Sequence, residues 1–314
     1  MKRGTRLVVL SGSSNLPLAN EICEELDIPL TPVDIQRFSN ENISVQIMES
    51  VRRKSVFIVQ SLYPHPSTML VELMLMIDAA RSASASEICV VIPHYSYARS
   101  DKKDKPRISI AAKLFARTME AAGADRFITM TLHSEHVQGF FDSPIDHLLG
   151  SQVVCDHLRK RDLSNAVALF DLGQDKRAGS YASVLGLPIA VYDKRRIDDT
   201  TVEVRSIVGD VEGKDVWIFD DEIASGKSMV AIADAIQAYR PGSVRIACTH
   251  GLFCGRAPEL LSDAPVDEVV TTNTIDISED RRIKKLTVLS VAPLMAKAIM
   301  RTYEGKSVSG LFGK

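Results

Sequence analysis

The sequence lacks an excess of charge of either sign. Its 314 residues include 38 lysines and arginines and 40 aspartates and glutamates. Charges that cancel so closely give the protein no overall field that would attract nucleic acid or an anionic membrane. We therefore expect no nucleic-acid partner and no membrane partner, and any anion site must be local.

Long hydrophobic runs are also missing, which bears on the N-terminus. The first residues are basic and lead into an apolar run at residues 7–10. That run is too short for the hydrophobic region of a signal peptide and far too short to cross a bilayer. We expect a cytoplasmic protein.

Cysteine is scarce and shows no paired spacing. The cysteines are odd in number, scattered, and mostly embedded in apolar segments: Cys23, Cys89, Cys155, Cys248 and Cys254. This pattern predicts buried free thiols. It is consistent with a reducing compartment.

Short apolar runs are present instead, and they alternate with longer stretches of helical periodicity. The runs are rich in β-branched residues and apolar on both faces, as buried parallel strands are. They lie at residues 6–10, 56–60, 88–93, 126–132, 166–170, 188–192, 215–219, 244–249, 267–272 and 286–292. Amphipathic stretches typical of helices lie between them, at residues 69–83, 108–122, 175–185 and 227–240. The alternation predicts an α/β fold with doubly wound, mostly parallel sheets.

The number of predicted strands indicates two domains. It exceeds what one compact sheet usually holds. We therefore divide the chain at Gly150, which precedes a new helix, into residues 1–149 and 150–314. Each half has a strand that ends in threonine and histidine, at residues 131–133 and 249–250, and this suggests a duplication.

Residues 219–228, FDDEIASGKS, end in Gly-Lys-Ser as a Walker A phosphate loop does. That motif requires a glycine five positions before Gly226, where this chain has Asp221. The stretch therefore needs another explanation. Two carboxylates, Asp220 and Asp221, follow directly on a predicted strand, and a helix is predicted to begin near Lys227.

Those carboxylates could accept hydrogen bonds from a diol, and the backbone amides of residues 224–228 at the start of the helix suit a monophosphate. Vicinal hydroxyls and a phosphate together describe ribose 5-phosphate. The alternative interpretation is an ordinary strand, turn and capped helix, in which the aspartates are solvated.

Two basic stretches also follow predicted strands. Residues 193–196, DKRR, leave the strand at 188–192 as a predicted flexible loop that could clamp a polyphosphate. Residues 94–103, HYSYARSDKK, combine cations with tyrosines that could stack on a base. For each stretch, a solvated surface loop is the alternative.

Two more stretches carry possible ligands. His133 and His136 are spaced three apart, but no third zinc ligand has a recognisable spacing, so a zinc protease is not expected. His133 could instead contact a phosphate or the shell of a magnesium ion, and a core histidine is the alternative. Asp171 directly follows the predicted strand at 166–170 and is either a ligand contact or a helix cap. Because ligands bind where the strands of open α/β sheets end, the shared position favours binding for all these stretches.

Taken in order, these segments resemble the class I ribose-phosphate pyrophosphokinases, also called phosphoribosyl diphosphate synthetases. The resemblance runs nearly end to end. It is carried by residues 37–39 and 43–47, 56–61, PHYSYARSDKK at 93–103, LHSEHVQGFF at 132–141, DKRR at 193–196, IVGDVEGKD at 207–215, FDDEIASGKS at 219–228 and the tail at 307–312.

The resemblance implies two domains of phosphoribosyltransferase type with the active site between them. The N-terminal domain would lie on the nucleotide side and the C-terminal domain on the ribose 5-phosphate side, with the tail packed back on the N-terminal domain. It implies self-association into a homohexamer or homodimer. The implied reaction transfers the β,γ-diphosphoryl group of ATP to the 1-hydroxyl of ribose 5-phosphate, with Mg²⁺ as cofactor and AMP released.

The resemblance also implies a role for each candidate residue. Ribose 5-phosphate would be held by Asp220, Asp221, Ala224, Ser225, Gly226, Lys227 and Ser228. ATP would be bound by Phe38, Asn40, Asn42, Arg99, Ser100, Asp101 and His133. The catalytic cations would be Lys194 and Arg196, and the metal would be served by His133 and Asp171. The ribose hydroxyl attacks phosphorus in line, so this chemistry needs alignment, metal and cations and no protein nucleophile.

The chain departs from the family pattern mainly around the nucleotide. Asn40 and Asn42 replace two carboxylates, Ser100 replaces a common glutamine, Thr131 replaces a common aspartate, and Lys227 adds a cation to the phosphate loop. A synthetase that prefers a nucleotide other than ATP is therefore an alternative. A non-catalytic regulatory homologue and a phosphoribosyltransferase are two more; the intact DKRR stretch argues against the former and the nearly full-length resemblance against the latter.

Overall fold

The computed structural model describes residues 6–172, 181–196 and 202–311 of the chain. They form two compact units, which we call unit 1 and unit 2. Unit 1 runs to Leu149 and also takes in residues 274–276 and the chain from Val291 onward; unit 2 consists of residues 150–273 and 277–290. The chain thus leaves unit 1 and returns to it.

Unit 1 is built on a five-stranded, entirely parallel sheet in the order β1-β4-β5-β6-β7. Its central strands are buried on both faces, because side chains that point to either side are apolar. The strands are β1 (Leu7–Ser11), β4 (Ser55–Val59), β5 (Glu87–Ile92), β6 (Arg126–Met130) and β7 (Ile145–Leu148).

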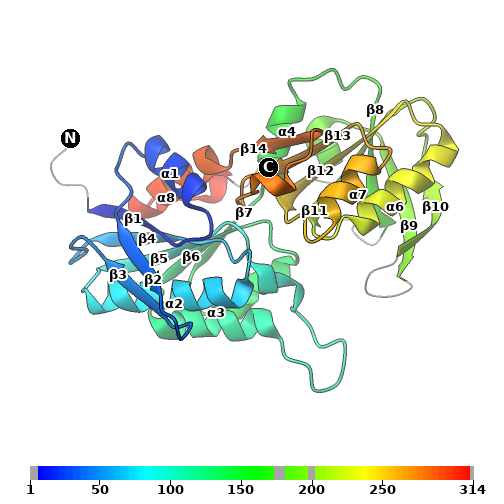
Figure 1. Cartoon of the computed structure of the whole chain (residues 1–314). Helices are drawn as coiled ribbons and strands as arrows, with labels where there is room; N and C mark the ends of the chain where they lie inside the picture. The colour runs from blue at the N-terminus through cyan, green and yellow to red at the C-terminus, as the bar shows by residue number, and fades with distance from the viewer. Residues whose placement is uncertain (1–5, 173–180, 197–201, 312–314) are drawn as a thin grey trace. The chain divides into compact units, whose positions relative to one another are not determined.

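Helices cover both faces of this sheet (Figure 1). On one face α1 (Leu16–Glu25) packs against α8 (Ala292–Tyr303), which returns from the far end of the chain. On the other face lie α2 (Pro66–Ser82) and α3 (Ala111–Ala122). Asn15 starts α1 by accepting a hydrogen bond from the N–H of Leu18, a standard N-cap. Single helical turns, η1 (Ser96–Arg99), η2 (Glu135–Phe140) and η6 (Ser309–Leu311), complete the unit.

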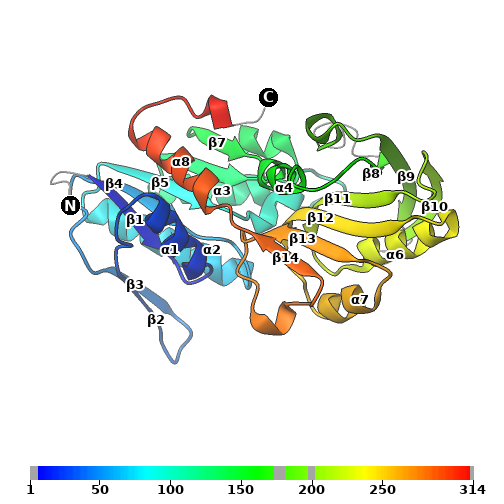
Figure 2. The ribbon, with the colours of Figure 1, turned by 90° about the horizontal axis from the view of Figure 1, so that it is seen from above.

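A separate antiparallel hairpin, β2 (Val33–Arg37) and β3 (Ile43–Ile47), belongs to unit 1 but not to its sheet. Partly buried and exposed residues alternate along β3, which packs against α2. Figure 2 shows the hairpin projecting from the body of the unit. Its two-residue period is that of a half-buried strand.

Unit 2 contains a seven-stranded sheet in the order β10-β9-β8-β11-β12-β13-β14. All neighbours are parallel except β9 and β10. The strands are β8 (Ala166–Asp171), β9 (Ile189–Arg196), β10 (Val202–Val208), β11 (Asp215–Ile223), β12 (Ser243–Gly251), β13 (Glu268–Thr272) and β14 (Leu286–Leu289).

Strand β11 shows how the unit 2 sheet fills two cores. Val216 and Ile218 point to the face covered by α6 (Lys227–Ile236) and α7 (Ala257–Asp263). Trp217 and Phe219 point to the other face, where α4 (Ser151–Leu158) and the helical residues 181–185 pack. This alternation is the two-residue period of a strand applied to an apolar run. The short helices η4 (Gln237–Tyr239) and η5 (Glu279–Arg281) lie in the connections.

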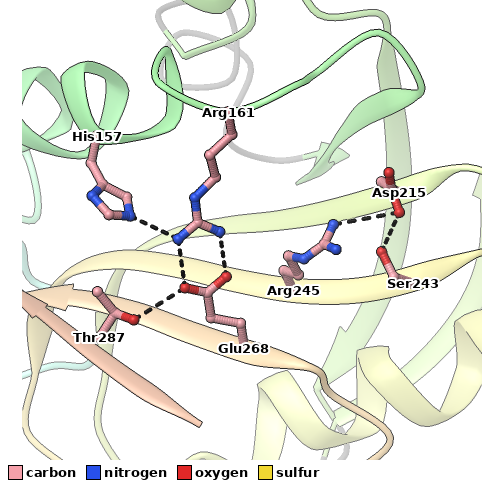
Figure 3. A network of polar contacts seen from close by, with 7 residues as sticks. All are labelled: His157, Arg161, Asp215, Ser243, Arg245, Glu268 and Thr287. Atoms are coloured by element: carbon pink, nitrogen blue, oxygen red, sulfur yellow. Dashed lines mark hydrogen bonds and ion pairs between the residues drawn. The ribbon is translucent and has the colours of Figure 1, made fainter.

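A polar network lies where the parallel strands of unit 2 begin (Figure 3). Glu268, the first residue of β13, accepts two hydrogen bonds from Arg161, at 2.5 and 2.8 Å. The guanidinium groups of Arg161 and Arg245 each lie 5.6 Å from the ring centre of Trp217. We call this group, together with His157, Asp215, Ser243 and Thr287, the strand-start network.

The predicted α/β class with mostly parallel sheets is confirmed, and every predicted strand is present. The helix expected after Gly150 is α4, whereas the strands β2, β3, β7 and β10 and the helices α1, α7 and α8 were not predicted. The predicted helix at 175–185 falls partly outside the described residues, and residues 181–185 are helical.

Four of the five thiols are buried and unpaired, as predicted. Burial raises the pKa of Cys23 to about 11 and that of Cys155 to about 12, so these thiols are weak nucleophiles at neutral pH. Among the helices that the structure describes, none has the length and apolar character needed to span a bilayer.

Candidate functional site

The best-defined cluster of predicted site residues lies where the strands of unit 2 end. Asp171 is the last residue of β8 and pairs in register with Tyr192 of the neighbouring β9. The ammonium group of Lys194 lies 2.7 Å from the carboxylate of Asp171, and each side chain is 15% exposed. The structure thus brings the predicted metal-site aspartate and the predicted catalytic lysine into direct contact.

Strand periodicity explains this contact. Tyr192 and Lys194 are two residues apart on β9 and therefore lie on the same face. The ammonium group lies 5.7 Å from the ring centre of Tyr192, which is almost fully buried. The tyrosine thus supplies an apolar, electron-rich wall beside the cation.

The prediction that DKRR forms a loop after its strand is wrong. β9 continues through Arg196 and pairs with β10, with Lys194 opposite Val204 and Arg196 opposite Val202. The charged residues join the strand because β10 supplies the hydrogen-bonding partner that an isolated charged run would lack. The side chain of Arg196 and residues 197–201 lie outside the part of the chain that the structure describes.

Asp220 and Asp221 lie within β11. The expectation that the strand ends before them is wrong, because β11 runs on to Ile223 beside β12. Asp221 is 6% exposed, and its N–H donates to the carboxylate of Asp220 at 2.7 Å. Burial, followed by the charge of Asp221, raises the pKa of Asp220, and Lys194 opposes that shift. Two carboxylates held together in this way favour a ligand that donates hydrogen bonds or carries positive charge.

Residues 224–228 form the turn from β11 into α6. Gly226 caps the helix with φ +73°, a left-handed conformation that favours glycine. The first residue of α6 is Lys227, as predicted, and its side chain is exposed. The first N–H groups of a helix have no acceptor within it, so they point outward as an anion-binding surface.

The connection after β12 holds this turn in place. The carbonyl of Ile223 accepts hydrogen bonds from the N–H groups of Leu252 and Phe253, at 2.9 and 3.2 Å, and that of Ala224 accepts one from Cys254 at 2.8 Å. The turn is therefore fixed from outside itself. A preorganised anion-binding turn spends less binding energy on ordering its backbone.

In unit 1, His133 follows β6 and its side chain is exposed. Thr131, two residues earlier, has φ +41°. A left-handed conformation costs a β-branched residue about 1–3 kcal/mol and is most often kept at functional sites. The hydroxyl of Ser134 then caps η2 by accepting a hydrogen bond from the N–H of His136.

Ser100 closes the loop that follows η1. Its hydroxyl donates to the carbonyl of Ser109 at 3.3 Å and accepts from the N–H of Ala111 at 3.4 Å, and its carbonyl accepts from Ala112 at 3.2 Å. Arg99 and Asp101 flank this closure, with Arg99 exposed. Ser100 therefore fixes the base of the loop. From the sequence it was predicted only as a nucleotide contact that departs from the family pattern.

The turn of the β2–β3 hairpin carries the remaining predicted nucleotide residues. Asn40 accepts a hydrogen bond from the N–H of Asn42 at 3.2 Å, and the N–H of Phe38 donates to the carbonyl of Asn42 at 2.9 Å. Phe38 is 50% exposed. An aromatic ring left half in water at the tip of a hairpin is available to stack on a planar ligand.

The predicted residues therefore fall into separate groups. Asp171, Lys194 and Asp220 come together in unit 2, and β5 and β6 are neighbours in unit 1, so the segments after them share one edge of that sheet. The remaining predicted residues lie in the turn of the β2–β3 hairpin, which projects from the body of unit 1 (Figure 2).

In the described ranges, no three histidine, cysteine, aspartate or glutamate side chains gather closely enough to hold a metal ion by themselves. A hard divalent cation does not require such a cage when a substrate phosphate supplies the other oxygens. Asp171 offers one carboxylate of the required kind, with Lys194 as its present counter-ion. These residues fit a cation shared with a phosphorylated substrate.

Tyr192 and a buried polar group in unit 1 are not among the residues predicted from the sequence. There Glu72 accepts from the N–H and hydroxyl of Ser13 and from the amide of Gln60, at 2.6, 2.7 and 2.7 Å. A side chain on Gly12 would come within 2.4 Å of Gln60. The small polar residues that follow β1 were the available signal, because a buried loop must satisfy its backbone groups.

Comparisons with known proteins agree with this architecture. Residues 7–123 match the N-terminal domain of ribose phosphate pyrophosphokinase, and residues 204–313 match the phosphoribosyl synthetase-associated domain. A putative ribose-phosphate pyrophosphokinase of Streptomyces coelicolor is 46% identical, with 98% of this chain and 97% of the relative covered. The ribose-phosphate pyrophosphokinase of Deinococcus radiodurans is also 46% identical, with 99% of both covered. The crystal structure of phosphoribosylpyrophosphate synthetase from Mycobacterium smegmatis superimposes with a TM-score of 0.89 at 36% identity, covering 95% of this chain and 99% of that one.

Proposed function

The chain belongs to the ribose-phosphate pyrophosphokinase family, and we propose a role for each unit in its reaction. It is a ribose-phosphate diphosphokinase, which transfers the β,γ-diphosphoryl group of ATP to the 1-hydroxyl of ribose 5-phosphate and releases AMP. The observation that carries the proposed site is the cluster of Asp171, Lys194 and Asp220 in unit 2.

Unit 2 is proposed to bind ribose 5-phosphate. Asp220 and Asp221 accept hydrogen bonds from the ribose hydroxyls, because their paired carboxylates favour donors. The outward N–H groups of residues 224–228 receive the 5-phosphate at the start of α6. Lys227 is exposed beside that position and adds positive charge.

Lys194 is proposed to stabilise the transferring group. In the structure the ammonium group of Lys194 forms an ion pair with Asp171. A diphosphoryl group carries more negative charge than one carboxylate and competes for the same ammonium. Arg196 lies two residues further on β9 and is proposed to contribute a second cation, since charge placed on the nonbridging oxygens lowers the barrier to phosphoryl transfer.

Magnesium is the proposed cofactor. Mg²⁺ usually keeps several waters and is held by one or two carboxylates together with substrate phosphates, and Asp171 supplies such a carboxylate. His133 is proposed to serve the metal's shell and the nucleotide phosphates from unit 1. The ion, when bound, neutralises phosphate charge, and the protein residues align the hydroxyl with the phosphorus.

Unit 1 is proposed to bind the nucleotide through the hairpin turn, with Phe38, Asn40 and Asn42, and through Arg99, Ser100 and Asp101. We predict that the double change Asn40→Asp and Asn42→Glu shifts the ratio of kcat/KM values toward ATP by about tenfold, the effect of one or two polar contacts. The measurement is kcat/KM for four triphosphates in the parent and variant. An unchanged ratio would show that the base is recognised elsewhere.

The test of the function is release of AMP from ATP in the presence of ribose 5-phosphate and magnesium, repeated with each of four nucleoside triphosphates. The expected result is turnover that depends on both ribose 5-phosphate and the metal. A Lys194→Ala chain prepared in parallel controls for contaminating enzyme. Absence of turnover with every triphosphate would overturn the proposal, and activity only with phosphoribosyl diphosphate and a free base would favour a phosphoribosyltransferase.

Two properties complete the proposal. Self-association into a homodimer or homohexamer is proposed from the family, and light scattering across a concentration series would measure it. A cytoplasmic location is proposed because no disulfide joins the five cysteines, all of which lie in the described residues and most of which are buried, and fractionation of cells that express the protein would test it.

A further inference from the structure

His147 lies in β7, a short polar strand that the sequence analysis did not recognise. β7 is the last strand of the unit 1 sheet and pairs with β6 alone, His147 opposite Thr129. The ring nitrogen Nε2 of His147 accepts a hydrogen bond of 2.9 Å from the backbone N–H of Leu132. Leu132 directly precedes His133, so β7 contacts the segment that carries the proposed nucleotide and metal contact.

The contact continues the β-sheet pairing with a side chain in place of a backbone carbonyl. β6 ends at Met130, and the N–H of the next residue, Thr131, still donates to the carbonyl of Leu148 at 2.9 Å. The backbone then turns, because Thr131 has φ +41°. The following N–H, that of Leu132, is received by the imidazole of His147.

That turn requires support from its surroundings. A left-handed conformation is unfavourable for a β-branched residue and persists where neighbouring contacts determine it. Two successive backbone N–H groups, those of Thr131 and Leu132, are tied to β7 at this point. The hydrogen bond of the Leu132 N–H depends on the side chain of His147 alone, so a substitution at His147 can remove it.

The imidazole also contacts the residues beyond His133. Because a backbone N–H can only donate, Nε2 of His147 carries no proton and Nδ1 carries one. Nδ1 lies 3.3 Å from the amide nitrogen Nε2 of Gln138, which is in η2; because that nitrogen is itself a donor, this is a packing contact and not a hydrogen bond. His147 thus touches Leu132 before His133 and Gln138 after it.

We propose that His147 is a positioning residue for the diphosphoryl transfer: it holds residues 131–134 in the turn that presents the exposed side chain of His133. The inference rests on the proposed function through the role given to His133. It adds a residue that does not touch substrate and acts through the backbone of Leu132.

The test uses two substitutions at His147 in the full chain. His147→Leu removes the acceptor and keeps an apolar side chain of moderate size. His147→Gln returns an acceptor, because its amide oxygen lies about as far from the backbone as Nε2 does. Gln138→Leu, which removes only the neighbour of the ring, serves if the first variant does not fold.

Hydrogen exchange of the Leu132 amide is measured first, since it requires no activity. We expect exchange at least tenfold faster in His147→Leu, the effect of losing roughly one hydrogen bond, and near-normal exchange in His147→Gln. Gln138→Leu should cause a smaller change in the same direction. Unchanged protection of Leu132 in His147→Leu overturns the proposal whatever the enzyme's activity.

Steady-state kinetics is measured second. We expect kcat/KM for the nucleotide to fall about ten- to a hundredfold in His147→Leu, with KM for ribose 5-phosphate unchanged, and to recover in His147→Gln. His157→Leu is the matched control, since His157 accepts a hydrogen bond from Arg161 in the strand-start network (Figure 3), and its kcat/KM should stay normal.

The two measurements separate the possible failures. Lost protection of Leu132 with normal nucleotide kinetics would make His147 a structural residue only and overturn the proposal. A wild-type chain without turnover would instead contradict the proposed function. The exchange comparison would then decide whether His147 holds this segment, and equal exchange in the Leu and Gln variants would count against it.

Discussion

The strands of unit 2 begin and end in polar clusters of opposite character. At their start, Arg161 and Arg245 meet Glu268 and Asp215, so that each cation has a carboxylate within 3.4 Å. At their end, the ammonium group of Lys194 contacts Asp171 and also acts on Asp220, while the neighbouring Asp221 opposes the charge of Asp220. Charges are matched at one end, whereas acidic groups predominate among the described side chains at the other.

The carboxyl pKa values follow this difference. Hydrogen bonds from Arg161 lower the pKa of Glu268 despite its burial. Burial and a like charge raise the pKa of Asp220. A lowered carboxyl pKa means that the folded state stabilises the carboxylate charge. A raised carboxyl pKa means that the carboxylate charge makes folding less favourable. The Arg161–Glu268 pair of the strand-start network therefore stabilises the fold, whereas the charge of Asp220 in the strand-end cluster makes folding less favourable, as expected for residues that we propose bind a ligand.

The largest effect that would break this comparison is expected from Lys194→Ala. The proposed role of Lys194 requires its charge mainly in the transition state, so turnover should fall by roughly a thousandfold or more with modest change in substrate KM. Some thermal stability should also be lost, because Asp171 is left without its counter-ion, so rates are compared below the unfolding transition of the variant. Kinetics of the variant against Lys284→Ala, an exposed lysine of unit 2, is the measurement, and a near-normal rate would contradict the proposed role.

Glu268→Gln should lose stability and keep its activity. The change leaves Arg161 without its carboxylate and should lower the free energy of unfolding by roughly 2 kcal/mol, while kcat/KM stays within about twofold. Denaturant titration and the AMP-release assay on one preparation measure both. A variant with normal stability and poor activity would show that the network serves catalysis.

The pH dependence of Glu268 adds a check. Its folded-state pKa is lowered, so its stabilisation is present above the unfolded-state pKa of about 4 and is lost as the pH falls through the folded value. Wild type should lose more stability than Glu268→Gln in that acidic range. Parallel unfolding curves between neutral and acidic pH would contradict the assignment.

A smaller effect of opposite sign is expected from Asp220→Asn. Because the folded-state pKa is raised, wild-type stability should decline as the pH rises from about 4 toward that value. The amide removes the charge and should raise the melting temperature at neutral pH by about 2–4 °C, roughly 1 kcal/mol. Turnover should nevertheless be lost. Calorimetry of wild type and variant across pH measures the melting temperatures. A lower melting temperature for Asp220→Asn at neutral pH would contradict the claim that the charge of Asp220 makes folding less favourable.

Arg245→Lys should have the smallest effect. It keeps the positive charge near Asp215 and loses the flat group that lies against Trp217. We expect a loss of about 0.5 kcal/mol in unfolding free energy and no change in kcat/KM. Unfolding monitored by the fluorescence of Trp217, the single tryptophan, is suited to this measurement. A loss as large as that of Glu268→Gln would mean that the cation–π contact, and not the ion pair, dominates the network.

The sequence was sufficient to predict those strands and helices whose own residues determine their structure. Apolar runs such as those of β5 and β11 are buried on both faces and could be recognised directly. Strand β10 and the last residues of β9 could not, because charged residues accept an extended conformation there only through mutual pairing. The hairpin was missed for a related reason, since its alternation is short and polar.

The candidate site shows the same division. The sequence located Asp171, Lys194 and Asp220 one at a time, after three different apolar runs, and their proximity follows from the strand order that the chain adopts. His147 was not predicted because its partner, Leu132, lies on another segment. Tyr192 was not predicted as a site residue because the continuation of β9 that places Lys194 beside its ring depends on pairing with β10. Partnerships between distant segments have no local signature, and so they had to come from the structure.

The return of α8 to unit 1 has a consequence for how the protein is made. Helix α1 packs against α8, which follows the whole of unit 2 along the chain. During synthesis the native contact between α1 and α8 cannot form until unit 2 has been translated. Unit 1 therefore stays incompletely packed during that interval, and a chain released before α8 is made would expose apolar surface that chaperones bind.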